Sequence, residues 1–215
     1  MEDHIFRIDR YENLLPRIRL TSEEIVIQVS EYHLDFPQER NQFVEWGVKL
    51  PMFVTPFYEF IQNCNMIPTQ EEAFRYYLSS NEEYFSHKQF SDEIMEGVKA
   101  RFYRTYPSLV RDVCFNKYVE ENLKDYVVMY NTTLDIEEGI DLMLAKDEEY
   151  WGICLYTDTT RAYKGREAKK KRHILFSNVT FIEFPVVFRG SRKAGDFFLY
   201  GKKEFNELMS RLGTD

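Results

Sequence analysis

The pattern of apolar residues changes near residue 124, and this change most constrains the fold. Before it, the chain carries helix signals: Thr69 and Glu72 form a capping box, and Pro107 stands where the first turn of a helix accepts proline. After it come three β-rich segments, 126–131, 140–145 and 150–157. Helical segments followed by a strand-rich region predict an α/β protein.

The first half of the chain predicts helices. Thr21 or Ser22 can cap a helix that begins at Glu23, and Ser91 can cap another. Further apolar patterns of helical type cover 36–49, 53–63, 92–104 and 107–124. We therefore expect a helical N-terminal extension over residues 1–95 and an α/β core over residues 96–215.

The second half predicts a sheet flanked by helices. The turn 146–149 joins its neighbours into a hairpin. Beyond it we expect a basic helix over 161–172, and then strands and a closing helix over 173–177, 180–188, 196–200 and 202–212. Pro185 cannot donate to a β-ladder, which places its strand at an edge or at a bulge. The expected core is a mixed central sheet with helices packed on it.

Composition excludes several classes of protein. Hydrophobic residues make up 44% and aromatic residues 16% of the chain, which favours a packed core over disorder. The sequence has no apolar run of about 18 residues and no apolar leader after Met1, so we expect neither a membrane-spanning helix nor a secretory signal. Three separated cysteines favour a reducing compartment, and we expect the cytoplasm. The P-loop, GxGxxG, GxSxG and HExxH motifs do not occur in the sequence.

Charge is divided unevenly along the chain. Residues 1–160 carry 30 acidic and 15 basic residues, whereas residues 161–215 carry 13 basic and 6 acidic residues. Seven of these bases form the basic segment: Arg161, Lys164, Arg166, Lys169, Lys170, Lys171 and Arg172. Such a segment can attract phosphates on its own face although the net charge is −8. It can equally be a solvated helix that balances the acidic remainder.

Asp141 opens an otherwise apolar segment, Leu142–Ala145. Because burying a carboxylate without a partner is costly, we expect Asp141 at a strand end that faces solvent, a hydrogen-bond donor or a cation. The hairpin can bring Asp158 beside it as a second carboxylate, and a helix packed behind can offer Glu120 or Glu121. Carboxylates suit Mg²⁺ or Mn²⁺, and a metal held by them can activate water against a phosphodiester.

On these residues the sequence resembles the PD-(D/E)XK, or restriction-endonuclease-like, nuclease superfamily. The resemblance covers about residues 107–188 and depends on element order and on Gly139-Ile140-Asp141, which opens a hairpin that the basic segment follows. It implies a restriction-endonuclease-like core and a metal-dependent endonuclease acting on DNA or RNA, similar to restriction or phage-defence effectors. Cutting both strands would favour a homodimer.

The resemblance implies roles for single residues. Asp141 matches the first acid of the family motif, and Glu120 or Glu121 matches its helical acid in position. The acid-x-Lys part falls near Cys154-Leu155-Tyr156, which contains neither type of residue. Asp158 is its nearest substitute, with Arg161, Lys169 or Lys170 in place of the lysine.

The expected site therefore has three overlapping parts. The catalytic residues are Asp141, Asp158, Arg161 and Lys169. The ligands of Mg²⁺ or Mn²⁺ are Asp141, Asp158, Glu120 and Glu121. The contacts to nucleic acid are Arg161, Lys164, Arg166, Lys169, Lys170, Lys171, Arg172 and His173.

Other interpretations of the same residues stay open. Asp141 can be a structural acid bonded to a backbone N–H or to an arginine, and Asp158 can cap a helix over 160–172. Without the acid-x-Lys part, the chain would be a non-catalytic module that binds nucleic acid or an acidic protein surface. The acidic N-terminal half can bind a protein partner, and the basic segment can serve only to neutralise that half.

Overall fold

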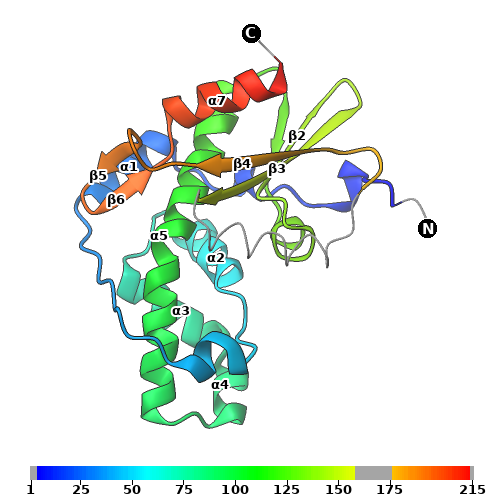
Figure 1. Cartoon of the computed structure of the whole chain (residues 1–215). Coiled ribbons are helices and arrows are strands. Elements are labelled where there is room, and N and C mark those ends of the chain that lie inside the picture. Colours follow the sequence, from blue (N-terminus) through cyan, green and yellow to red (C-terminus); the bar gives the residue numbers. More distant parts are fainter. Residues whose placement is uncertain (1–3, 158–175, 214–215) are drawn as a thin grey trace. The chain divides into compact units, whose positions relative to one another are not determined.

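The structure is a computed structural model of the chain, and it describes residues 4–157 and 176–213. These residues form two compact units. Of the described residues, the sheet unit comprises 4–17, 114–157, 176–192 and 198–213, and the helical unit comprises 18–113 and 193–197. The boundary predicted at residue 95 falls inside a long helix, α5 (Asp92–Asn122), which contributes to both units (Figure 1).

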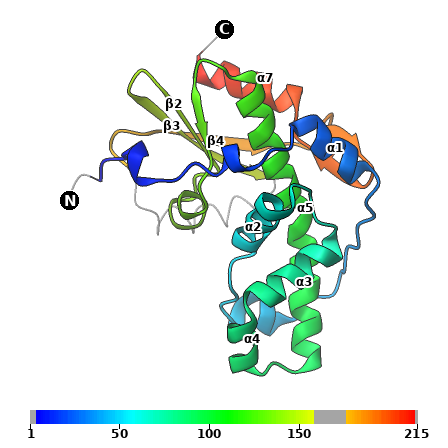
Figure 2. The same cartoon turned by 180° about the vertical axis from the view of Figure 1, so that it is seen from behind.

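The helical unit contains the first part of α5 and four shorter helices, which Figure 2 shows from behind: α1 (Ser22–Ser30), α2 (Val54–Cys64), α3 (Gln70–Ser80) and α4 (Glu82–Lys88). Two of the predicted caps, at Thr21 and Thr69, are confirmed. Thr21 caps α1 in a capping box with Glu24, and Thr69 caps α3 in a capping box with Glu72. Each box satisfies backbone N–H groups that the first turn of a helix leaves without a partner.

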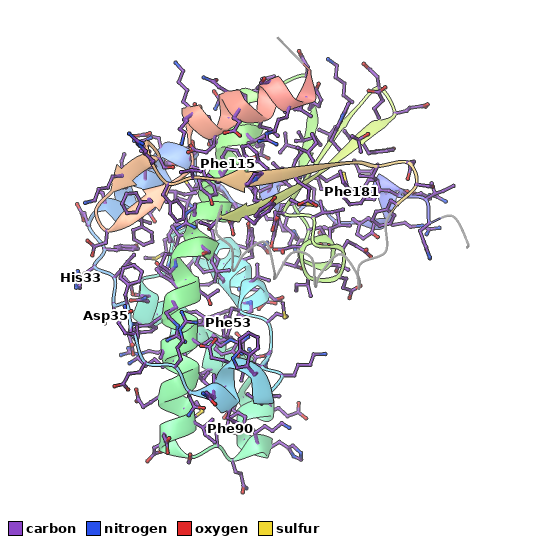
Figure 3. The ribbon with its side chains drawn as sticks, in the orientation of Figure 1. His33, Asp35, Phe53, Phe90, Phe115 and Phe181 are labelled. Carbon is purple, nitrogen blue, oxygen red and sulfur yellow. The ribbon has the colours of Figure 1, made fainter. Side chains whose placement is uncertain are left out.

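Aromatic rings fill the core of the helical unit. The ring of Phe102 lies edge-on to Phe53, which Figure 3 labels, at a centroid distance of 5.1 Å. It also lies 5.5 Å from the rings of Phe74 and Tyr77. The hydroxyl of the buried Tyr106 donates to the Pro68 carbonyl at 2.5 Å. Phenol rings can therefore be buried in this unit without leaving their hydroxyls unbonded.

Helix α5 differs from the two helices expected over 92–104 and 107–124, because it continues through Pro107. Proline removes the hydrogen bond to the carbonyl four residues earlier, which here belongs to Tyr103. The buried Gln70 side chain donates to this carbonyl at 3.0 Å. A side chain from α3 thus replaces the lost helical bond, and the helix does not have to end.

The segment 36–49 also differs from the prediction, because only Phe43–Gly47 forms a helical turn. The Arg104 guanidinium donates to the carbonyls of Pro37 and Glu39 at 3.1 and 2.8 Å. These backbone groups therefore have partners outside a helix. Trp46, on the helical turn itself, is 82% exposed.

A four-stranded mixed sheet forms the centre of the sheet unit. Its strands are β1 (Val127–Met129), β2 (Leu142–Lys146), β3 (Glu149–Thr157) and β4 (Thr180–Val186), in the order β1-β2-β3-β4. The first three are antiparallel neighbours, and β4 runs parallel to β3. Asp147 and Glu148 make the β2–β3 turn with φ of 48° and 68°, as a two-residue hairpin requires. β4 is an edge strand, which agrees with the position of Pro185 in it.

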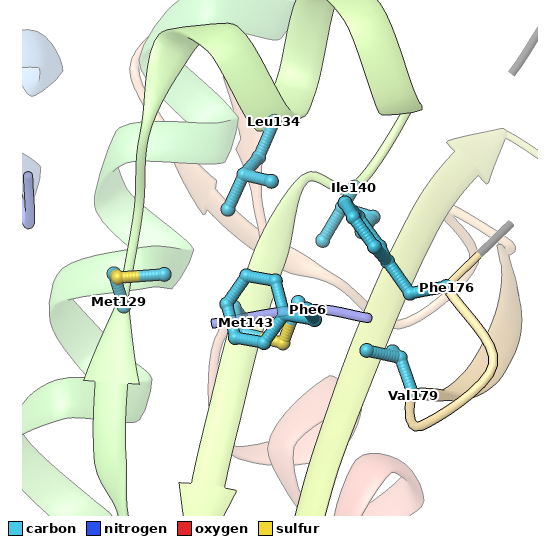
Figure 4. Packing of buried hydrophobic residues seen from close by; sticks show 7 residues of the cluster. All are labelled: Phe6, Met129, Leu134, Ile140, Met143, Phe176 and Val179. Carbon is cyan, nitrogen blue, oxygen red and sulfur yellow. The ribbon is translucent and has the colours of Figure 1, made fainter. Parts of the chain in front are cut away.

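The two faces of this sheet are covered differently. On one face, Phe115 of α5 stacks on Phe184 of β4, with ring centroids 6.4 Å apart, and α7 (Lys202–Leu212) packs beside them through Phe205 against Tyr118. The other face carries a hydrophobic cluster that the N-terminal segment closes with Phe6 (Figure 4). The cluster comprises Phe6, Met129, Leu134, Ile140, Met143, Phe176 and Val179.

Two further strands complete the described elements, β5 (Arg192–Ala194) and β6 (Phe197–Leu199), which pair with each other. The predicted strand over 173–177 begins outside the described residues, and Phe176 and Ser177 lie outside any strand. Helix α7 has the predicted bounds. No helix in the described ranges combines the length and apolar character needed to cross a membrane.

Candidate functional site

Asp141 immediately precedes the strand β2 and is placed there by a defined backbone turn. The helical turn Leu134–Glu138 ends at Gly139, whose φ of 66° suits glycine, and the next N–H, of Ile140, bonds back to the Leu134 carbonyl at 3.0 Å. Ile140 is buried in the cluster of Figure 4, which leaves Asp141 as the first polar side chain of the hairpin.

Asp141 is bonded to β3 through both its backbone and its side chain. Its N–H donates to the Ile153 carbonyl at 2.9 Å, and its Oδ2 accepts the N–H of Leu155 at 2.6 Å. The carboxylate thus extends the β2–β3 ladder where the backbone of β2 has ended. This contact matches the interpretation of Asp141 as an acid bonded to a backbone N–H, and it fixes the side chain close to the end of β3.

Helix α5 approaches Asp141 from the other side. The buried Asn116 side chain contacts the Asp141 carbonyl, with Nδ2 and O at 3.5 Å. Glu120 lies one turn further along, on the same side of the helix, whereas Glu121 is turned by about 100°. Glu120 forms an ion pair with Lys117, whose side chain is 10% exposed.

The acidic residues of the described chain do not complete a metal site by themselves. Residues 4–157 and 176–213 contain no group of three His, Cys, Asp or Glu side chains able to hold an ion. Cys154 is buried on β3 and pairs in register with Glu183 of β4. The second carboxylate predicted beside Asp141, Asp158, lies outside the described residues.

Most of the predicted site residues follow β3 directly. The following of them lie outside the described residues: Asp158, Arg161, Lys164, Arg166, Lys169, Lys170, Lys171, Arg172 and His173. Because β4 is parallel to β3, the connection 158–179 starts at the carboxyl end of β3 and must return to the opposite end of the sheet. β3 ends at Thr157, two residues after Leu155, whose N–H bonds to Asp141. In the sequence, the basic segment begins at Arg161, four residues after that strand end.

Two buried polar residues of α5 were not predicted from the sequence, and one of them, Asn116, contacts Asp141. Asn116 and Lys117 are both buried on the second half of α5. The available signal was their position within an apolar helix face, between Phe115 and Val119, where a polar residue needs a specific partner. Asn116 thus brings a polar group of α5 to the backbone of Asp141.

The helical unit contains a cavity of its own, of about 740 Å³. The loop 35–41 and the first part of α5 line it with acids and bases together, among them Asp35, Arg40 and Lys99. Lys99 is engaged by Glu71 at 3.2 Å. None of the site residues predicted from the sequence lines this cavity.

No protein-family model, curated protein or solved structure matches this chain. The case for a function therefore depends on its own residues.

Proposed function

We propose that the chain is a metal-dependent nuclease with a restriction-endonuclease-like core, acting on DNA or RNA. The observation that carries the proposal is the position of Asp141. Its carboxylate is fixed to Leu155 at the end of β3, and from that end the chain continues into seven lysines and arginines. An acid placed beside such a segment suits chemistry on a phosphodiester.

The topology supports the same proposal. Helix α5, the antiparallel strands β1, β2 and β3, a connection that contains the basic segment, and the parallel strand β4 follow one another in that order. This is the element order on which the resemblance to the PD-(D/E)XK superfamily depends. Fold alone does not establish activity, so the proposal requires the residues at Asp141 to act.

In this proposal each group has a physical task. Asp141 and Asp158 hold Mg²⁺ or Mn²⁺ through carboxylate oxygens, the donors these ions prefer, and Glu120 assists from α5. The bound ion would supply Lewis acidity and an activated water. Arg161 and Lys169 hold the phosphate, and the remaining bases of the segment, with His173, position the backbone of the nucleic acid.

The test is an incubation of the full chain with labelled single- and double-stranded DNA and RNA, in Mg²⁺, Mn²⁺ or chelator. We expect cleavage only with metal, and Asp141→Asn should reduce its rate by at least about 100-fold while leaving affinity nearly unchanged. Asparagine keeps an oxygen that can accept the Leu155 N–H, so this variant should remain folded. Asp125→Asn removes an exposed acid of the same unit and serves as the matched control. Equal cleavage by wild type and Asp141→Asn would contradict the proposal.

A second function, a non-catalytic nucleic-acid-binding module, is favoured by a specific observation. Glu120 is paired with Lys117, and Cys154 and Tyr156 stand where the family motif has an acid and a lysine. In that case the chain would bind nucleic acid with a steep salt dependence and cut none of the substrates with either metal.

A further inference from the structure

We infer that the N-terminal segment forms a pocket for one unstacked nucleotide of a single-stranded nucleic acid, next to the Asp141 hairpin. The inference rests on the proposed function in that it takes the same class of substrate. It concerns a different set of residues, and all of them lie among the described parts of the sheet unit.

The pocket is a cavity of about 460 Å³, within the range of small-molecule sites. Seven residues line it: His4, Ile5, Arg7, Arg10, Tyr11, Glu138 and Phe176. Glu138 precedes Asp141 by three residues, and Phe176 follows the basic segment. The cavity is thus built from the turn that leads into β2 and from the far end of the connection after β3.

Hydrogen bonds fix the N-terminal wall of the pocket. The Phe6 N–H donates to Asn178 Oδ1 at 2.7 Å, and Asn178 Nδ2 donates to the Phe6 carbonyl at 3.0 Å. The residues just before them are joined as well, because the Ser177 N–H donates to the His4 carbonyl at 2.9 Å. These bonds hold an otherwise irregular segment in one position, so the pocket is largely formed before a ligand arrives.

Aromatic rings support the floor of the pocket. Phe6 stacks on Tyr11, with ring centroids 5.4 Å apart and an interplanar angle of 12°, and meets Phe176 edge-on (Figure 4 shows Phe6 and Phe176). Tyr11 is partly exposed, whereas Phe176 is buried. Burial and the nearby Glu138 carboxylate raise the pKa of Tyr11, so its ring stays neutral. A base can stack on such a ring without sequence preference.

The pocket is lined by both basic and acidic side chains. Arg7 donates twice to Asp9, at 2.8 and 3.2 Å. In the part of the chain that the structure describes, no carboxylate is in ion-pair contact with Arg10, so its guanidinium can bind an anion. Glu138, which also lines the pocket, repels phosphate. A nucleotide would therefore place its phosphate toward Arg10 and its base toward Tyr11.

This arrangement favours a single strand over a duplex. Stacking on a side chain requires a base that has left its neighbours, and single-stranded segments expose such bases. Arg10 and Tyr11 line the same cavity, so one nucleotide can meet a cation and an aromatic ring there.

The experiment measures the affinity of the full chain for fluorescein-labelled single-stranded DNA and RNA of about 12 nucleotides, between about 50 and 200 mM salt. Arg10→Gln should weaken binding about 3- to 10-fold and reduce the slope of log K against log salt by about 0.7, the contribution of one phosphate contact. Arg17→Gln is the matched control, because Arg17 lies on the same segment, is exposed and pairs with Glu12 outside the pocket. It should leave the slope unchanged.

The base is tested separately. Tyr11→Leu should weaken single-strand binding at least about fivefold and leave duplex binding unchanged, and Tyr11→Phe, which keeps the ring, should behave as wild type. An excess of inorganic phosphate should compete only weakly, since it occupies the Arg10 side alone.

The outcomes separate this inference from the nuclease proposal. Loss of affinity in Arg10→Gln and Tyr11→Leu supports the pocket even if no metal yields cleavage. If Arg10→Gln and Arg17→Gln bind alike at every salt concentration, or Tyr11→Leu binds single strands like wild type, the pocket is wrong even if the chain cleaves its substrates.

Discussion

In the helical unit, tyrosine hydroxyls bond to backbone carbonyls: Tyr32 to Ile67 at 2.7 Å and Tyr77 to Pro51 at 3.2 Å. In the sheet unit, charged groups instead stand at the rim of the core, with Asp141 at the start of β2 and Arg10 beside the N-terminal pocket. In the helical unit, these polar groups form hydrogen bonds that link segments of the chain to one another. The sheet unit keeps charge where a ligand can reach it, so we expect stability to depend most on the helical unit and ligand binding on the sheet unit.

The largest effect should come from the aromatic core of the helical unit. Phe102→Ala removes a ring that meets three others and should lower the free energy of unfolding by about 3–5 kcal/mol. Trp46→Ala, at a ring that is 82% exposed, should change it by less than about 0.5 kcal/mol. Urea unfolding measures the free energy of unfolding of both variants. Similar losses of stability in Phe102→Ala and Trp46→Ala would contradict the view that the aromatic core stabilises the helical unit.

The next effect concerns the carbonyl that Pro107 leaves without a helical partner. Gln70→Leu removes the donor to Tyr103 and the bonds of Gln70 to the backbone of Asp35, and should cost about 2–3 kcal/mol. Pro107→Ala restores an N–H for the Tyr103 carbonyl, so in that background the cost of Gln70→Leu should fall by about 1 kcal/mol. Strict additivity in the double-mutant cycle would show that Gln70 does not replace the helical bond.

A smaller effect is expected at Asp141. Asp141→Ala leaves the partly buried Leu155 N–H without its acceptor and should cost about 1–2 kcal/mol, whereas Asp141→Asn should cost clearly less. Urea unfolding compares the stability of the two variants. Asp141→Asn should keep most of the stability and lose cleavage, as expected if this residue of the sheet unit acts on a ligand. If both variants lose stability equally, the Leu155 bond is not what fixes this side chain.

The smallest effect is a pH dependence in the helical unit. The Tyr103 hydroxyl, followed by Lys99 and Arg75, lowers the pKa of Glu71. A lowered pKa in the folded state stabilises the fold above the unfolded pKa of about 4.3, and this contribution is lost as pH falls through the folded value. Because Glu71 is 42% exposed, we expect less than about 1 kcal/mol. Unfolding curves between about pH 7 and pH 3 should be less acid-sensitive in Glu71→Gln, and equal sensitivity would refute the assignment.

Local signals made much of the fold predictable. The cap at Thr21, the capping box at Thr69, the turn at Asp147 and the bounds of α7 depend on residues close together in sequence, and each of these predictions is confirmed. The continuity of α5 depends on Gln70, which is 33 residues from Tyr103. A proline signal read alone therefore predicted an interruption that a distant side chain prevents.

The candidate site also contains features that local sequence signals predict and features that depend on distant residues. A polar residue at the start of an apolar strand identified Asp141, and the alternative of a bond to a backbone N–H describes its contact with Leu155. The N-terminal pocket gave no sequence signal, because Phe6 meets Asn178 across 172 residues. The ion pair between Glu120 and Lys117 was also not predicted from the sequence, although the two residues are only three positions apart.

The most direct test of the central claim, that the sheet unit acts on nucleic acid, is equilibrium binding of the full chain to labelled single-stranded DNA and RNA in rising salt. We predict clear binding near 50 mM salt that weakens steeply toward about 200 mM, with a slope corresponding to several phosphate contacts. A fluorescence anisotropy that stays at the value of the free strands near 50 mM salt, even with protein in large excess, would contradict the account. The basic segment would then serve only to neutralise the acidic half of the chain.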